Sequence, residues 1–184
     1  MNILHLITSI DQGGAENHLA SLSRGQSKNN KVTVAYIKGN SFWKNYYRKL
    51  GIKTFNLKKN QNKFVNYIKV IFFLKKLYKK YDIEVVHAHL PHMEFLGWLS
   101  VFFSSSKVKF IISKHVDNDF FGGSNYKNNS LLASLISKII SLKTKNIIAI
   151  SHSVKNYFSN GIFKISKKKI KVIYYGIDNF YIQY

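Results

Sequence analysis

The sequence predicts an α/β protein built on a doubly wound, mainly parallel sheet of seven strands. Short β-branched runs alternate with helical stretches along the 184 residues, as they do when helices connect parallel strands. The strand segments are nearly all apolar, which indicates a sheet that helices cover on both faces. The length fits one domain, and no internal repeat or Pro/Gly-rich linker divides it.

The first three elements follow from two apolar runs and the turn between them. We expect the apolar run Asn2–Ile10 to form the first strand and Ala15–Ser23 to form the helix after it. Lys31–Lys38 contains Val-Thr-Val-Ala-Tyr-Ile, and β-branched and aromatic residues of this kind favour a strand. Together these segments make the first strand–helix–strand unit of the predicted sheet.

The next three elements are a helix, a short strand and a long helix. Ser41–Leu50 is predicted to be helical, and Gly51 follows it as a typical residue for ending a helix. Lys53–Leu57 is predicted to be a short strand. Lys63–Tyr81 has the periodicity of a long helix that covers the sheet.

The middle of the chain repeats this alternation. Glu84–Leu90 is predicted to be a strand that stops at Pro91, because proline cannot donate a hydrogen bond to a neighbouring strand. His92–Phe103 is predicted to be a helix, and Lys109–His115 a strand. The strand ends at this point because a polar stretch follows.

The last third of the chain begins with that polar, glycine-containing stretch, Val116–Asn129, which we expect to be a loop. The elements expected after it are a helix, a strand, a short helix and a final strand: Ser130–Lys143, Asn146–Ser151, Ser153–Ser159 and Lys169–Tyr174. Seven strands in this arrangement indicate a Rossmann-like sheet, in which ligands bind at the carboxyl ends of the strands.

The charge of the chain is strongly positive, at +21. Lysine supplies 27 of the 29 basic residues and arginine only two. Arginine is the side chain that binds phosphates and base edges through paired hydrogen bonds. Because arginine is so scarce here, we expect no nucleic-acid partner. Two explanations stay open for the lysines: a solvated surface shaped by A/T-rich codons, or attraction to an anionic membrane surface.

The composition also bears on where the protein works. The chain has no cysteine, which excludes disulfides, thiolate zinc sites and cysteine nucleophiles. Its beginning lacks the basic region and cleavage site of a signal peptide, and no apolar run is long enough to span a bilayer. We therefore expect a cytoplasmic protein and leave open a peripheral position at the inner face of the membrane.

Two glycines follow the first predicted strand, in Asp11-Gln12-Gly13-Gly14-Ala15-Glu16. Adjacent glycines at a strand-to-helix turn allow positive φ and let a ligand approach the backbone. The start of the next helix offers free N–H groups to a phosphate. Glu16 offers an alternative, because its side chain can cap the first helical turn. The pattern is neither Gly-x-Gly-x-x-Gly nor a Walker motif.

Histidines gather where the fourth and fifth predicted strands end. His87 and His89 alternate with Ala88 and therefore point to one face, and His92 follows shortly after them. We expect no metal, because only Glu84 and Glu94 lie near enough in the sequence to complete a ligand set. The alternative is that one histidine packs in the sheet and another bonds a loop.

His115 ends the fifth strand and precedes the long polar loop, which is a favoured position for a functional residue. Asp117 lies at the start of that loop and is a further polar candidate. The sixth strand ends in Ser151-His152-Ser153, and Ser153 is a suitable N-cap for the next helix.

These motifs, in this order and spacing, resemble the N-terminal domain of family 4 glycosyltransferases, which have the two-domain GT-B architecture. The resemblance runs from Ile3 to Asp178 and rests on five segments: Gly-Gly-Ala-Glu, Val-His-Ala-His, the strand-end His115, Ser-His-Ser, and Tyr-Tyr-Gly-Ile-Asp. The family more often has asparagine where Tyr175 stands.

The resemblance implies roles for individual residues. Gly13, Gly14 and Glu16 would lie at the phosphate and sugar of a nucleotide-sugar donor. His115 would be the catalytic-centre residue that contacts the transferred sugar or the acceptor. His87, His89, Asp117, Ser151 and Ser153 would line the cleft. The family works without a metal or other cofactor.

The implied function is hexosyl transfer from a nucleotide sugar to a saccharide or lipid-linked acceptor in surface-polysaccharide synthesis. We expect residues 1–178 to form the acceptor-side domain and 179–184 to begin a linker, with no donor-binding domain in this chain. The family's Glu-x7-Glu pair is missing here. The chain is then an excised domain, a subunit with a donor-binding partner, or an inactive remnant.

The predicted helix Lys63–Tyr81 leaves a second function open. Val65, Ile68, Phe72 and Tyr81 share roughly one face in this prediction, while Lys69, Lys76, Lys79 and Lys80 crowd another. Such a helix covers a sheet with a solvated lysine face, or it lies on an anionic lipid surface. The alternative function is a non-catalytic module that binds a membrane surface or a partner protein.

Overall fold

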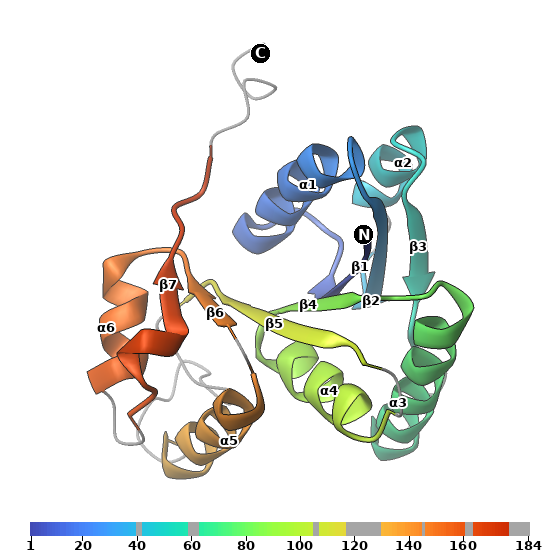
Figure 1. The fold of residues 1–184 in the computed structure, drawn as a ribbon. Coiled ribbons are helices and arrows are strands. Elements are labelled where there is room, and N and C mark those ends of the chain that lie inside the picture. The colour runs from blue at the N-terminus through green and yellow to red at the C-terminus, as the bar shows by residue number, and fades with distance from the viewer. Residues whose placement is uncertain are drawn as a thin grey trace.

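The computed structural model describes residues 1–39, 42–58, 63–104, 107–116, 130–144, 146–160 and 164–176. Its core is a seven-stranded sheet in the order β3-β2-β1-β4-β5-β6-β7, and every neighbouring pair of strands is parallel. The order reverses beside β1, where β2 lies on one side and β4 on the other. The predicted doubly wound α/β fold is therefore confirmed (Figure 1).

Strands and helices alternate along the whole chain. The strands are β1 Asn2–Ser9, β2 Lys31–Lys38, β3 Lys53–Asn56, β4 Val85–His89, β5 Lys109–Lys114, β6 Asn146–Ala149 and β7 Ile170–Val172. The α-helices are α1 Gly14–Ser27, α2 Phe42–Lys49, α3 Lys63–Lys80, α4 Pro91–Phe102, α5 Ser130–Lys143 and α6 His152–Asn160. A short 3-10 helix, Lys167–Lys169, precedes β7.

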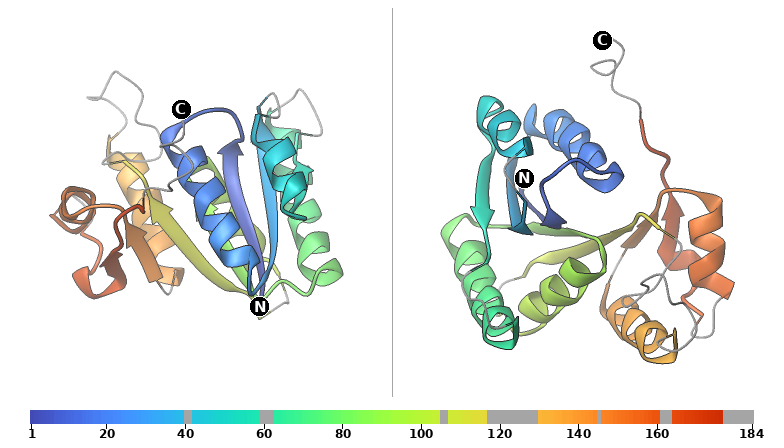
Figure 2. Two further views of the ribbon diagram at one scale, coloured as in Figure 1. Left: turned by 90° about the horizontal axis from the view of Figure 1, so that it is seen from above. Right: turned by 180° about the vertical axis from the view of Figure 1, so that it is seen from behind.

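Helices cover the two faces of the sheet in separate layers. Helices α1 and α2 lie on one side, and α3, α4 and α5 lie on the other (Figures 1 and 2). Each layer has its own apolar core. Ile7, Leu19 and Trp43 belong to the core under α1 and α2, whereas Leu6 and Met93 belong to the larger core on the opposite side.

Most element boundaries agree with the sequence prediction, and the differences have local causes. Helix α1 continues to Ser27 rather than Ser23, and it includes Gly25, which the structure accommodates within the last turn. The final strand is shorter than predicted, because Lys167–Lys169 form a 3-10 turn. Gly51 has φ +69° and ends α2 as expected, with its N–H donating to the Arg48 carbonyl.

In helix α3 the predicted separation of an apolar face from a lysine face is wrong. Asn66, Val70 and Leu74 are buried toward the sheet side. The apolar side chains expected to pack together are exposed instead: Val65 is 37% exposed, Ile68 43% and Phe72 60%. Among the side chains of α3 whose exposure the structure describes, the exposed lysines are Lys69, Lys76, Lys79 and Lys80. Residues at i, i+4, i+7 and i+11 share a helix face, so Val65, Phe72, Lys69 and Lys76 form one outward surface.

Several predictions fall outside the described residues. The loop Val116–Asn129 is described only at Val116, and Asp117 lies beyond it. The predicted linker at 179–184 also lies outside. Within the described segments, no helix has both the length and the apolar character needed to cross a membrane.

Candidate functional site

The sheet brings the predicted histidines together on the side covered by α1. His5 of β1 pairs in register with His87 of β4, and His89 pairs with Ser113 of β5. Partners in a parallel register point to the same face, and residues two apart on one strand do so as well. His115, two positions after Ser113, therefore joins the same face at the carboxyl end of β5.

Three of these histidines form, with one residue at each end, a continuous chain of hydrogen bonds that crosses three strands. His5 Nε2 lies 2.7 Å from Gln26 Oε1 on α1, and His5 Nδ1 lies 3.1 Å from His89 Nε2. His89 Nδ1 lies 3.0 Å from His115 Nε2. His115 Nδ1 is bonded to the hydroxyl of Tyr175, which follows β7.

The Gln26 oxygen at one end of this hydrogen-bond network sets the tautomers within it, because the Tyr175 hydroxyl at the other end can either donate or accept. Gln26 presents an oxygen, so His5 donates through Nε2 and accepts at Nδ1. His89 then donates through Nε2 to His5, and His115 donates through Nε2 to His89. His115 Nδ1 accepts the Tyr175 hydroxyl proton. Each imidazole carries one N–H proton, so all three rings of the hydrogen-bond network are neutral.

Burial favours the same neutral state. It lowers the pKa of His5 to about 4, and burial together with the nearby His18 and Lys114 lowers the pKa of His115 to about 3. Desolvation and the neighbouring histidines hold the pKa values of His87 and His89 well below the usual range. These rings act as hydrogen-bonding groups or ligands at pH 7 and not as cations.

His18 of α1 and Tyr175 close the site at its outer end. Their rings stack with centroids 3.7 Å apart, and His18 also contacts the edge of His115. Beside them lies a groove of about 630 Å³ between α1 and the segment after β7. His18 and Gln26 line it together with Ile173 and Tyr174, so both the network and exposed apolar groups border this groove.

The Gly13–Gly14 turn starts α1, which also carries His18 and Gln26. Gly13 is the N-cap, with an extended φ of −179°, so neither glycine uses positive φ as the sequence suggested. The Glu16 carboxylate occupies the space beside Gly13, because a Cβ there would overlap Glu16 Oε2. The carboxylate of Glu16 thus lies against the turn expected to receive a phosphate, and the N-cap of α1 has no side-chain hydrogen bond.

Of the two serines after β6, Ser151 and not Ser153 caps the next helix. Helix α6 begins at His152, and Ser151 Oγ accepts the Val154 N–H at 3.2 Å. Ser151 is therefore the N-cap, and Ser153 is an exposed residue of the first turn. The cap lies two residues earlier than predicted because β6 ends at Ala149, before its apolar run is complete.

Three predicted site residues converge, and four unpredicted residues join them. His87, His89 and His115 lie together as expected, whereas His92 is exposed on α4. Sequence reasoning missed four members of the site: His5, His18, Gln26 and Tyr175. Two of them could have been noticed in the sequence. His5 is a histidine within an otherwise apolar first strand, and Tyr175 is a tyrosine in place of the family's usual asparagine.

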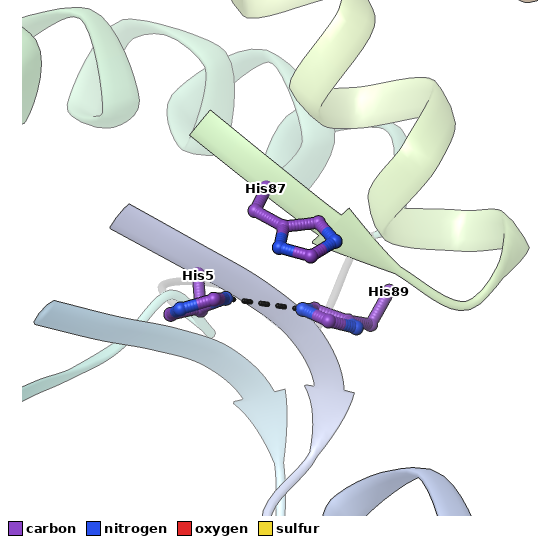
Figure 3. A group of neighbouring side chains, drawn as sticks. All are labelled: His5, His87 and His89. Carbon is purple, nitrogen blue, oxygen red and sulfur yellow. Dashed lines mark hydrogen bonds between the residues drawn. The ribbon is translucent and has the colours of Figure 1, made fainter. Parts of the chain in front are cut away.

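The three imidazoles of His5, His87 and His89 also form a compact group of potential ligands. One nitrogen from each lies within 4.8 Å of the other two (Figure 3). His87 Nε2 is bonded to Ser113 Oγ at 2.8 Å, so Nδ1 is its nitrogen that faces the group. No carboxylate of the described residues belongs to this cluster. Glu94 pairs with Lys114, and Glu84 accepts the backbone N–H of Asn2.

The family model for Glycosyltransferase Family 4 matches residues 12–179. No curated protein sequence gives a significant match. HepE from Anabaena, solved with UDP and glucose, has a TM-score of 0.75 and 16% identity over 97% of this chain and 45% of its own.

A glycosyltransferase from Rickettsia africae has a TM-score of 0.69 and 18% identity over 99% of this chain and 45% of its own. The lipopolysaccharide outer core galactosyltransferase WaaB has a TM-score of 0.67 and 15% identity over 95% of this chain and 45% of its own. The chain thus spans about half the length of these structures. At such low identity the likeness shows a shared fold, that of one GT-B half.

Proposed function

The chain belongs to glycosyltransferase family 4, and from this membership we propose that it forms the acceptor-side half of a hexosyltransferase. A second, nucleotide-binding domain would complete the enzyme, in the same polypeptide or in a partner subunit. The reaction would move a hexose from a nucleotide sugar to a saccharide or lipid-linked acceptor. Surface-polysaccharide synthesis is the proposed setting, because WaaB is a lipopolysaccharide galactosyltransferase with the same fold.

The observation that carries this proposal is the position of His115. It stands at the carboxyl end of β5 in a doubly wound sheet, which is where ligands bind in this architecture. Its ring is held from both sides by His89 and Tyr175, and His18, which lies edge-on to it, lines the groove between α1 and the segment after β7. A ring fixed in this way is preorganised to meet a sugar.

The remaining roles are proposed around His115. Gly13 and Gly14 would let the donor phosphate approach the start of α1, and Glu16 would move aside when the phosphate binds. His89 would orient His115, and His87 would support His89. Ser151, Ser153 and Asp117 would line the acceptor side of the cleft. No metal is assigned to the transfer step.

The test is sugar transfer by the two-domain enzyme or reconstituted pair, with UDP-glucose as the first donor because HepE was solved with UDP and glucose. His115→Ala is expected to lower turnover roughly tenfold or more under conditions where circular dichroism shows the variant folded. His152→Ala, an exposed histidine, is the matched control and should leave turnover unchanged. Full activity of the folded His115→Ala enzyme would refute the role.

We also propose that the layer of α3, α4 and α5 rests on an anionic membrane surface. This layer carries most of the large exposed apolar side chains on the described helices: Val65, Ile68, Phe72, Phe102, Leu135, Ile139 and Leu142. Lys69 and Lys76 stand among those of α3. Apolar groups surrounded by lysines suit a lipid interface, and this position would present the enzyme to a lipid-linked acceptor.

The same surface supports the alternative function, a non-catalytic module that binds a membrane or a partner protein. Acceptor binding separates the two functions. Saturable binding of short oligosaccharides, followed by NMR shifts in His115 and Tyr175, favours the transferase half. Binding to anionic vesicles alone, with no shift from any saccharide in the panel, favours the module.

A further inference from the structure

His5, His87 and His89 are arranged more specifically than a packed core requires. They come from the two central strands, β1 and β4, and they are almost completely buried, with exposed fractions of 0%, 5% and 0%. Figure 3 shows the three rings grouped together, with His5 and His89 joined by a hydrogen bond and His87 beside them. The expectation of no metal considered His87, His89 and His92 and did not include His5, which only the β1–β4 register brings in.

Each ring is held from outside by its other nitrogen. His5 Nε2 contacts Gln26 Oε1 at 2.7 Å, and His87 Nε2 contacts Ser113 Oγ at 2.8 Å. His89 Nδ1 contacts His115 Nε2 at 3.0 Å. Histidines that bind metals are characteristically oriented in this way, by a hydrogen bond to the nitrogen that does not bind. The inner nitrogens, His5 Nδ1, His87 Nδ1 and His89 Nε2, are left facing one another.

The spacing of two of the inner nitrogens, those of His5 and His89, is close to that of a tetrahedral site. Zinc–nitrogen bonds of 2.0–2.1 Å place two ligating nitrogens about 3.3 Å apart. His5 Nδ1 and His89 Nε2 are 3.1 Å apart, and all three nitrogens lie within 4.8 Å of one another. The His87 ring lies against the rings of His5 and His89 and is bonded to Ser113 Oγ, and a modest shift of this ring would complete the set.

We propose that His5, His87 and His89 bind one divalent transition-metal cation of the zinc type. Imidazole ligands favour zinc, copper, nickel and cobalt over magnesium or calcium, which prefer oxygen ligands. The proposed metal site adjoins His115 and is coupled to its proposed sugar-transfer role, because the ligand His89 is hydrogen-bonded to His115.

Binding would shift protons along the network without releasing any. In the metal-free chain, His89 Nε2 carries the proton shared with His5 Nδ1, and the metal needs both lone pairs. The His89 proton therefore moves to Nδ1 and is donated to His115 Nε2. The proton of His115 moves in turn to its Nδ1 and is donated to the Tyr175 oxygen, whose own hydrogen rotates away. Metal binding thus reverses the tautomer of His115.

The first experiment measures stoichiometry with Zn²⁺ and Co²⁺. Because the three rings are buried, the chelator-treated chain is refolded with and without the metal and then titrated against a chromophoric chelator. We expect one equivalent per chain, tetrahedral d–d bands with Co²⁺, and a higher melting temperature with Zn²⁺, since a ligand that binds only the folded state stabilises it. Mg²⁺ should produce none of these effects.

Variants assign the binding to the cluster. His87→Gln should lose the stoichiometric site, and Gln26→Leu, which keeps all three ligands, should weaken binding about 10- to 100-fold. His152→Gln, at an exposed position, should bind as the unchanged chain does. Absence of a stoichiometric site, or equal binding by folded His87→Gln, would overturn the proposal.

A measurement on the unchanged chain keeps the proposal testable if His87→Gln does not fold. Long-range ¹H–¹⁵N NMR of the imidazole nitrogens reports the tautomer of each ring. Saturating Zn²⁺ should shift His5 Nδ1, His87 Nδ1 and His89 Nε2 and should move the proton of His115 from Nε2 to Nδ1. Imidazole spectra that do not change at saturation would overturn the site.

Discussion

A buried imidazole in this chain behaves differently from an exposed one, because its charged form has lost the stabilisation of water. His5, His87, His89 and His115 all have lowered pKa values, with desolvation as the largest cause. Each remains neutral and has one donor and one acceptor nitrogen. The hydrogen-bond chain from Gln26 to Tyr175 depends on this property, because a charged ring within it would present two donors.

The free energy of unfolding of the metal-free chain should therefore depend on pH in one direction. Unfolded histidines take up protons near pH 6.5, whereas folded His5 has a pKa of about 4 and folded His115 a pKa of about 3. When the pKa of a histidine is lower in the folded than in the unfolded state, the folded state is most stable at a pH above the unfolded pKa. That stability is lost as the pH falls toward the folded pKa. We expect constant stability above about pH 7.5 and a fall below about 6.5, of about 1.4 kcal/mol per pH unit for each such histidine.

Urea unfolding at a series of pH values measures this dependence. For His115→Gln, the free energy of unfolding is compared with the value of the same variant at neutral pH. Between pH 6 and pH 4 it should fall less steeply than in the unchanged protein, by roughly the contribution of one histidine. The exposed His152→Gln should leave the slope unchanged. A free energy of unfolding that stays level from pH 7 to pH 5 would contradict the burial argument.

At the scale of elements, helix α4 lies close to the sheet because Gly97 has no side chain. A Cβ at Gly97 would lie 2.8 Å from Leu6 Cδ1 and 3.0 Å from Phe110 Cε2. Both neighbours belong to the larger core. On the same helix, Glu94 forms a buried ion pair with Lys114 of β5. Close packing and the ion pair therefore fix α4 against β4 and β5, the strands that end at His89 and Lys114.

Gly97→Ala should destabilise the fold by about 1–3 kcal/mol, because the added methyl group overpacks a filled core. Gly25 in α1 is the matched control, since nothing lies within 4 Å of a Cβ at that position. Gly25→Ala should stabilise the fold by about 0.5–1 kcal/mol, the usual gain for this change within a helix. Chemical denaturation of both variants measures the two effects. Equal changes would show that helix propensity, and not packing, governs Gly97.

Taken as a whole, the molecule is asymmetric in the chemistry of its two helical layers. The layer of α1 and α2 covers the histidine network and exposes one large apolar side chain on its described helices, Phe42. The layer of α3, α4 and α5 exposes many, with lysines among them. A net charge of +21 adds long-range attraction to any anionic surface.

Binding to vesicles should therefore depend on lipid charge, on salt and on one surface of the protein. We expect stronger sedimentation with phosphatidylglycerol-containing vesicles than with phosphatidylcholine alone, and weaker sedimentation as salt rises. The double change Lys69→Gln and Lys76→Gln should weaken binding roughly 10- to 30-fold, at about 1 kcal/mol per lysine.

The matched control removes the same charge elsewhere. Lys167→Gln with Lys168→Gln changes two exposed lysines of the 3-10 helix before β7. This pair should have a smaller effect if the α3 surface faces the lipid. Equal losses from both pairs would show that net charge alone drives binding, and equal binding to neutral and anionic vesicles at low salt would contradict the electrostatic contribution.

The local pattern of the sequence was enough to identify the fold and the family. Apolar strands such as Lys31–Lys38 and glycine stops such as Gly51 act through neighbouring residues, so their structure could be predicted without the rest of the chain. The order of the strand-end motifs supplied the resemblance, which the family match confirms. The alternation of side chains along a strand was also sufficient to predict that His87 and His89 share one face.

The tertiary structure decided which of these residues meet. The β1–β4 register brings His5 to His87, and the return of the chain after β7 brings Tyr175 to His115, 60 residues earlier in the sequence. Helix packing turned Phe72 outward, because the sheet selects one face of α3 and leaves the rest to solvent. Sequence pattern records what lies next to a residue along the chain, whereas register and packing join residues far apart, and the candidate site is made almost wholly of such contacts.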